Sequence, residues 1–475
     1  MNENFWKGMK WAVRFASTLL NPSLLRNRPF HISVPYRITI ILVAILMLSA
    51  GSDSKGATSS ELWLPQDKKI SIPDGKLDFR GYMGLALRYS PALVGSRVEI
   101  ELKRLDETDA RWSFIPAVTV RTGYYFNNPP GTRPYYLQFF PDGFNPVESY
   151  GTLQARKVMT EMAIMGHQQV IAEFIYRLAE SFLDLDALTR AESYQNQLIG
   201  LVEQNVTYTE TRLKSGTGTP AENKLAIQEE ELARMEDERI KASEIPILGA
   251  LKANLDLQPD QNLDLDSANA REQVLNTFDP ASVTLAQAEA NSFALKTQRL
   301  KQELQGRNIG LAKLKYLPTF FFTVENASPI ESNNNTSNQV YFSFGLQMPL
   351  WDNLSRVRNI DRQKLILKQY EADGELKEQD LLSKWQTAQS KLKTAETDLK
   401  VAKGQLELAK AREKQAEAGY HEGRQPFSAL ITERRGRLEA QKLAEVRSLA
   451  YDKVILEIRY LSGDLYNSYV QAESQ

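Results

Sequence analysis

The chain of 475 residues contains no cysteine and only three histidines. The absence of cysteine excludes disulfides and thiolate metal ligands, and it suits an oxidising compartment. His31, His167 and His421 lie far apart, and no carboxylate cluster or partner histidine is spaced for a metal. No phosphate-binding loop, nucleophile elbow or paired-acid motif occurs either. The sequence therefore predicts no enzyme, no metal site and no cofactor.

The chain also lacks an excess of charge and long apolar runs. It has 58 basic and 59 acidic residues, so it offers no basic excess for binding nucleic acid. After the N-terminal region, no apolar run reaches the about 20 residues of a membrane-spanning helix. The one apolar run, Ile38 to Leu48, is shorter and is followed by the small residues Ser49 to Ser52. This pattern predicts a secretory signal peptide with a long leading region over residues 1–52, with a membrane anchor or a buried helix as the alternative.

The chain does contain a long internal repeat. Pro116 and Pro318 end matching Ala-x5-Pro motifs at an offset of 202 (318 − 116 = 202), and Gly216 matches Gly423 at an offset of 207 (423 − 216 = 207). Such a repeat indicates a duplicated structural unit. Each copy reads in the order helix, proline-led strand, loop, strand, very long helix, glycine turn, return helix. We assign the first copy to residues 53–258, and a polar insertion followed by the second copy to residues 259–475.

The clearest strand pair lies in the second copy. Pro318 opens one strand, and the next, residues 340–348, alternates with a period of two. The apolar face of this second strand consists of Val340, Phe342, Phe344, Leu346 and Met348. Such alternation is typical of a transmembrane β-strand, and a half-buried strand of a soluble sandwich is the alternative. In the first copy we predict strands at 117–126 and 150–159, with a loop between them.

A very long helix follows each strand pair. Residues 372–419 contain no proline, and apolar or small residues recur there every seven positions. The heptad predicts supercoiled helix packing, and its many alanines predict a close approach between helices. The counterpart in the first copy is residues 168–215. Each helix would reach about 75 Å at 1.5 Å per residue, and a return helix begins after each glycine turn, near Pro220 and Pro426.

The number of strands predicts an oligomer. Four strands per chain are too few to close a transmembrane barrel, since the smallest have about eight. Open sheet edges do not occur in lipid, so other chains must complete the sheet, and three chains would supply twelve strands. We therefore predict a mostly helical protein with long coiled-coil hairpins and a β-barrel completed as a trimer. A periplasmic or surface coiled-coil structural or adhesin protein is the alternative, although it leaves the duplicated proline-led hairpins unexplained.

This order of elements resembles the TolC-like outer-membrane efflux proteins over nearly the whole chain after the signal. Each motif is weak alone, but their order, read twice, is specific. The residues that carry the resemblance are Ser90-Pro91, the Ala-x5-Pro motifs ending at Pro116 and Pro318, Ala179–Leu185, the turns at Gly216 and Gly423, Gln347–Asp352 and Tyr460–Gly463.

The resemblance implies a homotrimer with a twelve-stranded barrel in the outer membrane and a twelve-helix tunnel through the periplasm. Such a trimer is the exit duct of a tripartite efflux or type I secretion system. It conducts substrate passively from an inner-membrane pump, to which a periplasmic adaptor (membrane fusion) protein couples it. The apolar strand face would then contact outer-membrane lipid, and nucleic acid is not a partner. The substrate, the pump and the adaptor stay open.

The two glycine turns correspond to the periplasmic tips of this family, where we expect the adaptor to dock. The predicted docking residues are Arg212, Gly216, Thr217, Thr219, Gly423, Arg424 and Gln425. The alternative is that the two glycines only end helices. Some family members narrow the pore with paired aspartates beyond the second tip. Because Ala429 and Thr432 stand there, we expect no aspartate ring, and Glu222 in the first copy is the candidate for a pore constriction.

Overall fold

The structure is a computed structural model that describes residues 75–122, 135–275, 278–327, 339–348 and 350–471. The predicted signal peptide at 1–52 lies outside these residues. The described elements, in chain order, are α3 (Phe79–Tyr89), α4 (Pro91–Trp112), β1 (Val118–Thr122), β2 (Tyr135–Phe144), α5 (Pro146–Lys214), α6 (Pro220–Asn254), α7 (Ala270–Leu275), α8 (Leu285–Asn291), α9 (Phe293–Leu314), β3 (Thr319–Ala327), β4 (Gln339–Gln347), α10 (Ser355–His421), α11 (Phe427–Leu461), α12 (Asp464–Tyr466) and a π-helical turn (Asn467–Gln471).

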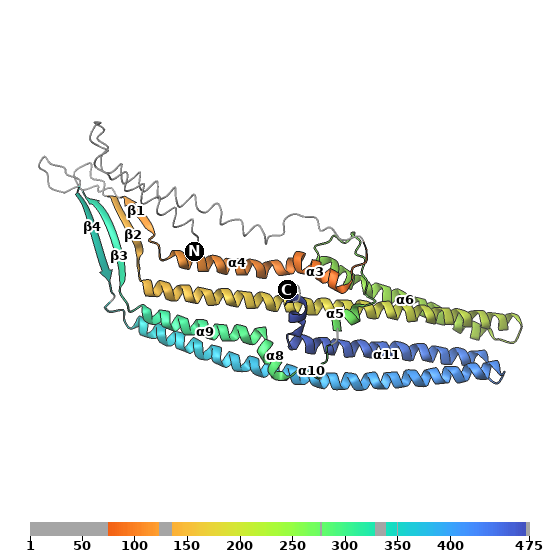
Figure 1. Ribbon diagram of the computed structural model, residues 1–475. Coiled ribbons are helices and arrows are strands. Elements are labelled where there is room, and N and C mark those ends of the chain that lie inside the picture. The colour runs from red at the N-terminus through yellow and green to blue at the C-terminus, as the bar shows by residue number, and fades with distance from the viewer. Residues whose placement is uncertain (1–74, 123–134, 276–277, 328–338, 349, 472–475) are drawn as a thin grey trace, which may run out of the picture. The chain divides into compact units, whose positions relative to one another are not determined.

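Four long helices form two antiparallel hairpins. Helix α5 packs on α6, α10 packs on α11, and α5 also packs on α11, which joins the hairpins. Helix α6 and α11 each have 35 residues. Figure 1 shows the strands at one end of these helices and the turns between α5 and α6 and between α10 and α11 at the other.

The heptad positions of α10 face its neighbours. Trp385 and Leu399 are buried, as are the alanines Ala388, Ala402 and Ala416. Alanine has a small side chain, so a seam that contains it lets helix backbones approach closely. The predicted heptad therefore matches the buried face of this helix.

The sequence prediction was wrong about the second strand of the first hairpin. Residues 150–159 lie inside α5, and the strand is β2, within the region predicted as a loop. Asn145 explains where the helix begins, because its side-chain oxygen accepts hydrogen bonds from Val147 N–H at 3.1 Å and Glu148 N–H at 3.2 Å. Pro146 occupies the first helical position, where a missing N–H costs nothing. Both long helices begin earlier than predicted, α5 at Pro146 and α10 at Ser355.

The strands form one antiparallel sheet in the order β1-β2-β3-β4. Among the described strands, β1 and β4 are the edges. The register aligns apolar residues across the sheet, because Val118 pairs with Phe139, Phe139 with Phe322 and Phe322 with Phe344. One face of the sheet therefore carries a continuous apolar row.

The largest cluster of buried side chains lies at the level of α3 and α7 and joins the two halves of the chain. Phe79 and Phe182 meet edge to face with ring centroids 5.4 Å apart, and the buried Tyr82 hydroxyl donates to the Leu251 carbonyl at 2.6 Å. Leu456 and Leu465 from the second half complete the cluster. Among the described residues, no helix combines the length and the apolar character needed to cross a membrane.

Candidate functional sites at the helical tips and on the sheet

The first tip is the turn between α5 and α6. Gly216 has a φ of 74°, a left-handed conformation that costs glycine no steric energy. The N–H groups of Thr217 and Gly218 both donate to the Arg212 carbonyl at 2.9 Å. These bonds satisfy a carbonyl that the end of the helix would otherwise leave unpaired.

The second tip, between α10 and α11, has the same backbone pattern. Gly423 has a φ of 68°. The N–H groups of Arg424 and Gln425 donate to the Gly419 carbonyl at 2.8 and 3.0 Å. Each of these residues lies 207 positions after its counterpart in the first tip (for example 419 − 212 = 207). The two tips are therefore equivalent turns, and both predicted glycines lie where the backbone requires them.

A second glycine in each tip makes room for one side chain, and the sequence reasoning missed it. A Cβ added to Gly218 would lie 2.9 Å from the Cβ of Arg212, and a Cβ added to Gly419 would lie 3.1 Å from the side chain of Gln425. Position 218 corresponds to 425, and 212 corresponds to 419. The glycine therefore occupies opposite members of the pair in the two tips, and the other member carries the side chain. Aligning the copies at an offset of 207 would have found it.

The first tip is further secured by a capping box. Thr219 Oγ1 accepts from Glu222 N–H at 3.2 Å, and the Glu222 carboxylate accepts from Thr219 N–H at 3.1 Å. Arg212 lies 3.7 Å from the same carboxylate and donates to the Thr217 carbonyl at 2.7 Å. Glu222, the candidate for a pore constriction, therefore helps to start α6, and its role in the pore stays a prediction.

The second tip holds its polar side chains differently. Pro426, which has no side-chain hydrogen-bonding group, occupies the N-cap of α11. Arg424 pairs with Glu422 at 2.8 Å, and its side chain is 77% exposed. The guanidinium of Arg424 is thus presented to solvent, whereas that of Arg212 is held against its own turn.

The tips contact each other near their ends. The rings of Tyr208 in α5 and Phe427 in α11 lie 4.7 Å apart, and Tyr420 lies 5.6 Å from Phe427. Arg435 in α11 pairs with Glu229 in α6 at 3.3 Å. Lys442 in α11 pairs with Glu236 at 3.2 Å. Hydrogen bonds from Arg239 and then from Lys442 lower the pKa of that carboxylate to about 2. The end of the molecule that carries the predicted docking residues is therefore one joined unit.

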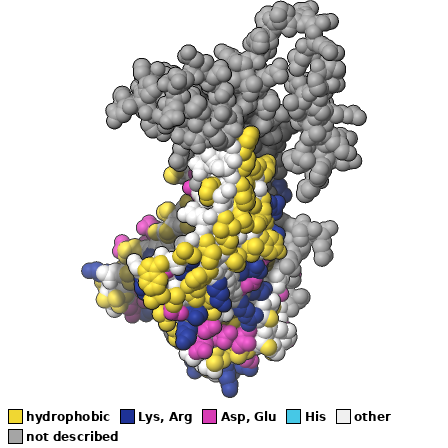
Figure 2. Space-filling view, turned by 90° about the vertical axis from the view of Figure 1, so that its left-hand side faces the viewer, with side chains coloured by type: hydrophobic (Ala, Val, Ile, Leu, Met, Phe, Trp, Pro, Cys, Tyr) yellow, Lys and Arg dark blue, Asp and Glu magenta, His cyan; other side chains and the backbone are white. Residues whose placement is uncertain are grey.

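The predicted lipid-facing residues of β4 are strongly exposed. Phe342 and Phe344 are each 71% exposed, and Leu346 and Met348 are 54% and 52% exposed. The side chain of Val340 lies outside the described residues. Figure 2, which views the molecule from the strand end, shows hydrophobic side chains gathered in a band over the described sheet. Large exposed apolar patches of this kind mark interaction surfaces.

The opposite face of the sheet is mainly polar. Thr323 pairs with Ser343, and Thr319 with Gln347. Phe321 lies on this face, opposite Gly345, and a Cβ added to that glycine would lie 1.9 Å from the Phe321 ring. The end of the Phe321 ring therefore occupies the space that a side chain at position 345 would need. The sheet thus has one apolar face and one mainly polar face.

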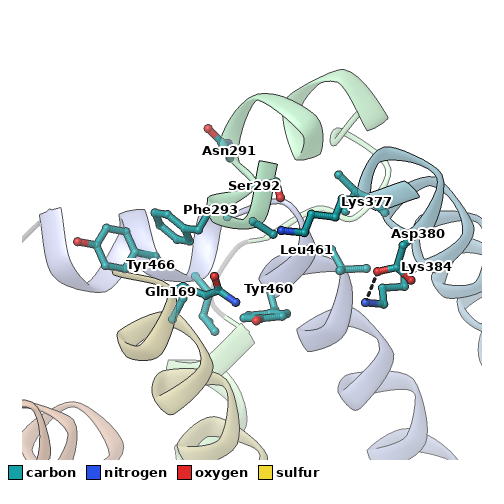
Figure 3. A pocket seen from close by; sticks show the side chains of 15 residues that line it. Gln169, Asn291, Ser292, Phe293, Lys377, Asp380, Lys384, Tyr460, Leu461 and Tyr466 are labelled. Carbon is teal, nitrogen blue, oxygen red and sulfur yellow. Dashed lines mark hydrogen bonds and ion pairs between the residues drawn. The ribbon is translucent and has the colours of Figure 1, made fainter. Parts of the chain in front are cut away.

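The described residues contain no group of three or more His, Asp or Glu side chains that could hold a metal ion. A cavity of about 180 Å³ lies where α8 meets α9 beside α10 and α11 (Figure 3). Its lysines already have partners, because Lys384 pairs with Asp380 at 2.6 Å and Lys377 donates to Gln298 at 2.9 Å. The Lys377 contact joins α10 to α9, whereas the Lys384 pair lies within α10.

Solved structures similar to this chain are outer-membrane channels. VceC from Vibrio cholerae is 12% identical, with a TM-score of 0.64 over 81% of this chain and 96% of that chain. CmeC from Campylobacter jejuni is 13% identical, with a TM-score of 0.65 over 87% and 95%. MtrE from Neisseria gonorrhoeae, described in its open state, is 14% identical, with a TM-score of 0.65 over 81% and 88%. No protein-family model and no curated protein matches the sequence. At these identities the likeness establishes the fold, which is the TolC-like fold expected from the sequence.

Proposed function

We propose that the chain is one subunit of an outer-membrane channel that serves as the exit duct of a tripartite efflux or type I secretion system. The observation that carries this proposal is the four-stranded sheet, with an apolar row across one face and a polar opposite face. Apolar-out and polar-in alternation is what a transmembrane barrel requires. The similarity in fold to outer-membrane channels supports the same assignment.

The duct is a homotrimer. Strands β1 and β4 each have an edge without a partner among the described strands. Lipid cannot satisfy the backbone groups of such edges, so β1 of one copy must pair with β4 of the next. Three copies of four strands close a barrel of twelve, which lies within the size range of outer-membrane barrels.

The long helices carry the duct into the periplasm. Helix α5 has 69 residues and begins directly after β2. At 1.5 Å per residue it extends about 100 Å from the sheet to the first tip. The tips therefore lie at the end that an adaptor protein and an inner-membrane pump can reach. Conduction is passive, and the energy comes from the pump.

The adaptor docks at the tips. The exposed Arg424 of the second tip is the strongest candidate contact, because its guanidinium faces solvent. Thr217, Thr219 and Gln425 add polar groups around the same end of the molecule. Arg212 contributes indirectly by holding the first turn in shape through the Thr217 carbonyl.

The two faces of β4 provide the experimental test. Phe344→Arg puts a charge on the apolar face, where Arg near the bilayer midplane costs about 2–4 kcal/mol per chain, so trimers in the outer membrane should be lost. Gln347→Arg is the matched control on the polar face, and it should assemble normally and alter the conductance of the channel in planar bilayers. Fractionation and native mass measurement of the detergent extract report both results. Equal behaviour of the two variants would refute the proposal.

A further inference from the structure

Five charged side chains interact where α7 packs on both α5 and α11. Helix α11 supplies Asp452 and Glu445, α5 supplies Asp186 and Arg190, and α7 supplies Arg271. The Arg271 guanidinium lies 2.7 Å from one carboxylate oxygen of Asp452 and donates to the other at 3.0 Å. Arg190 pairs with Asp186 at 3.0 Å and lies 3.6 Å from Glu445. We call these five residues the joint cluster.

The joint cluster holds more negative than positive charge. Three carboxylates face two guanidinium groups, which leaves a net charge of −1 at neutral pH (2 − 3 = −1). Asp452 is only 4% exposed and Asp186 only 6%. A carboxylate that is removed from water without a full set of partners takes up a proton more readily. Burial accordingly raises the pKa of Asp186, and it raises the pKa of Asp452 to about 6 although Arg271 opposes the change.

The groups that flank the joint cluster do not balance its charge. Lys453 of α11 pairs with Asp184 of α5 at 2.8 Å and lies 3.3 Å from Glu180, so two acids already match it. On α10, Glu396 and Lys400 pair with each other at 2.7 Å. Further titratable neighbours are neutral or acidic, and they are Tyr194 of α5, Tyr451 of α11 and Glu272 of α7. The cluster therefore keeps its negative excess.

The equivalent positions of the first copy do not carry this cluster. Ile245 stands where Asp452 stands in the second copy (452 − 207 = 245), and it is 69% exposed. Lys241 stands in the place of Ser448 (448 − 207 = 241), whose hydroxyl accepts a hydrogen bond from Arg271. Arg271 itself belongs to the insertion between the copies. The cluster is therefore a feature of the place where the second hairpin meets the first, and the duplicated helix pair does not require it.

Proton binding favours the packed form of this joint. Movement of α11 away from α5 would bring water to Asp452 and Asp186, and the pKa of each would return toward its ordinary value. The packed joint thus binds a proton more tightly than the separated joint does. Because separation then releases a proton, it becomes rarer as the pH falls through about 6, the pKa of Asp452 in the packed joint.

We propose that the joint cluster is a pH-sensitive switch, which takes up one proton at mildly acid pH and then stabilises the packing of α7 and the second hairpin on α5. This inference goes beyond the proposed function, because every group in it belongs to a single chain. In the proposed duct the same joint connects the two hairpins that reach the tips. An acid periplasm should therefore hold these hairpins together.

Infrared titration and hydrogen exchange of the full chain in detergent test the switch. In the natural chain, the absorption of protonated carboxyl groups should contain a component with its midpoint near pH 6. After correction for the intrinsic effect of pH on exchange, the amides of α7 and of the facing turn of α11 should open about tenfold less often at about pH 5 than at about pH 7.5.

Three variants separate the switch from a structural role. Asp452→Asn removes the charge and keeps the shape, so it should lack the infrared component and show the acid level of protection at both pH values. Arg271→Gln increases the negative excess, so protection at neutral pH should fall and its dependence on pH should become steeper. The control Glu396→Gln changes an exposed pair on α10 and should behave as the natural chain does.

The outcome for the two buried aspartates decides the proposal. Coupled carboxylates share a proton, so loss of the pH dependence in either Asp452→Asn or Asp186→Asn supports the switch. Persistence of the pH dependence in both variants, equal protection of the natural chain at the two pH values, or more frequent opening at acid pH would overturn it. Neither measurement involves conduction, so these results are distinguishable from a failure of the proposed function.

Discussion

The two tips have the same backbone and different side-chain support. In both, a glycine with positive φ ends the outgoing helix, and two successive N–H groups donate to one carbonyl. The first tip adds a capping box and the bond from Arg212 to the Thr217 carbonyl. The second places Pro426 at the N-cap and leaves Arg424 exposed. The duplicated turn has therefore kept its backbone conformation. In the first tip the side chains hold the turn itself, whereas in the second tip a charged side chain is exposed to solvent.

The exchanged glycine shows that the packing of the two tips is also equivalent. In the first tip the side chain of Arg212 fills the space beside Gly218, and in the second tip the side chain of Gln425 fills the equivalent space beside Gly419. Close-packed regions tolerate changes that conserve volume far better than changes that add to it. Each tip should therefore tolerate substitution of both members of the pair better than substitution of its glycine alone.

The largest expected effect comes from adding a side chain at Gly218 in the first tip, so that both members of the Arg212–Gly218 pair carry one. In Gly218→Gln, the new Cβ would meet the Arg212 Cβ at 2.9 Å and backbone atoms of Arg212 and Leu213 at 3.1 Å. Overpacking of this kind costs about 1–3 kcal/mol, and it should speed hydrogen exchange of the Thr217 and Gly218 amides. Adding Arg212→Gly should recover part of the protection. The packing account fails if the double variant exchanges faster than Gly218→Gln.

The corresponding substitution in the second tip should cause a smaller loss of protection from hydrogen exchange. Gly419→Arg meets only the flexible side chain of Gln425, at 3.1 Å. Replacing a helical glycine also recovers up to about 1 kcal/mol of helix propensity. Exchange of the Arg424 and Gln425 amides reports the net result, and Gln425→Gly in the same chain should restore full protection. A greater loss here than at Gly218 would contradict the comparison.

Substituting the turn glycines should affect both tips equally. Apart from the adjoining residues, no heavy atom of the described part of the chain lies within 4 Å of a Cβ added to Gly216 or Gly423, so backbone strain sets the cost. Alanine in the left-handed conformation costs about 1–2 kcal/mol, and asparagine costs less. Export assays and trimer levels should be measured for both alanine variants. If export falls while trimers remain, the tips dock a partner. If the two fall together, the tips matter only for folding and the docking proposal is wrong.

Removing the capping box should have a smaller effect, confined to the first tip. Thr219→Ala should cost about 0.5–2 kcal/mol and raise exchange at the start of α6. Pro426→Thr combined with Ala429→Glu places the same two residue types at the corresponding positions of the second tip (222 + 207 = 429), and it should slow exchange at the start of α11. If Thr219→Ala leaves exchange unchanged, the capping box is not what secures the first tip.

Charge reversal at Arg424 should barely change stability. Exposed ion pairs such as Arg424 with Glu422 contribute about 0–1 kcal/mol, so trimer levels should stay constant. Crosslinking to the adaptor should weaken. Arg212→Glu is the comparison, because it removes the bond to the Thr217 carbonyl and should loosen the first turn. Unchanged crosslinking in Arg424→Glu would remove this residue from the docking site.

Local signals were enough to place the tips, the seam of α10 and the β4 alternation. At the tips, glycine and proline are placed by the backbone conformations that they favour. In β4, Phe342 and Phe344 follow a period of two. The location of β2 was not readable in this way. Phe140 has a φ of 54°, and the register shifts between Phe139 and Phe144, so the alternation is interrupted.

The first turns of α5 were missed for a tertiary reason. This part of the helix packs on both α4 and α9, and a Cβ added to Gly151 would lie 2.8 Å from a methyl carbon of Leu311. A helix covered on two sides does not show one clean heptad, so the prediction began only at Gln168.

Closure of the sheet by neighbouring copies is the central claim, and disulfide trapping between the edge strands tests it most directly. The natural chain has no cysteine, so the only thiols are those introduced. Thr119→Cys in β1 is combined with Ser343→Cys or Gln347→Cys in β4, all on the polar face, and the protein is oxidised in isolated outer membranes. Ring closure predicts that covalent species stop at three copies. Bands that continue beyond three copies, or no intermolecular disulfide from either pair in correctly inserted protein, would contradict it.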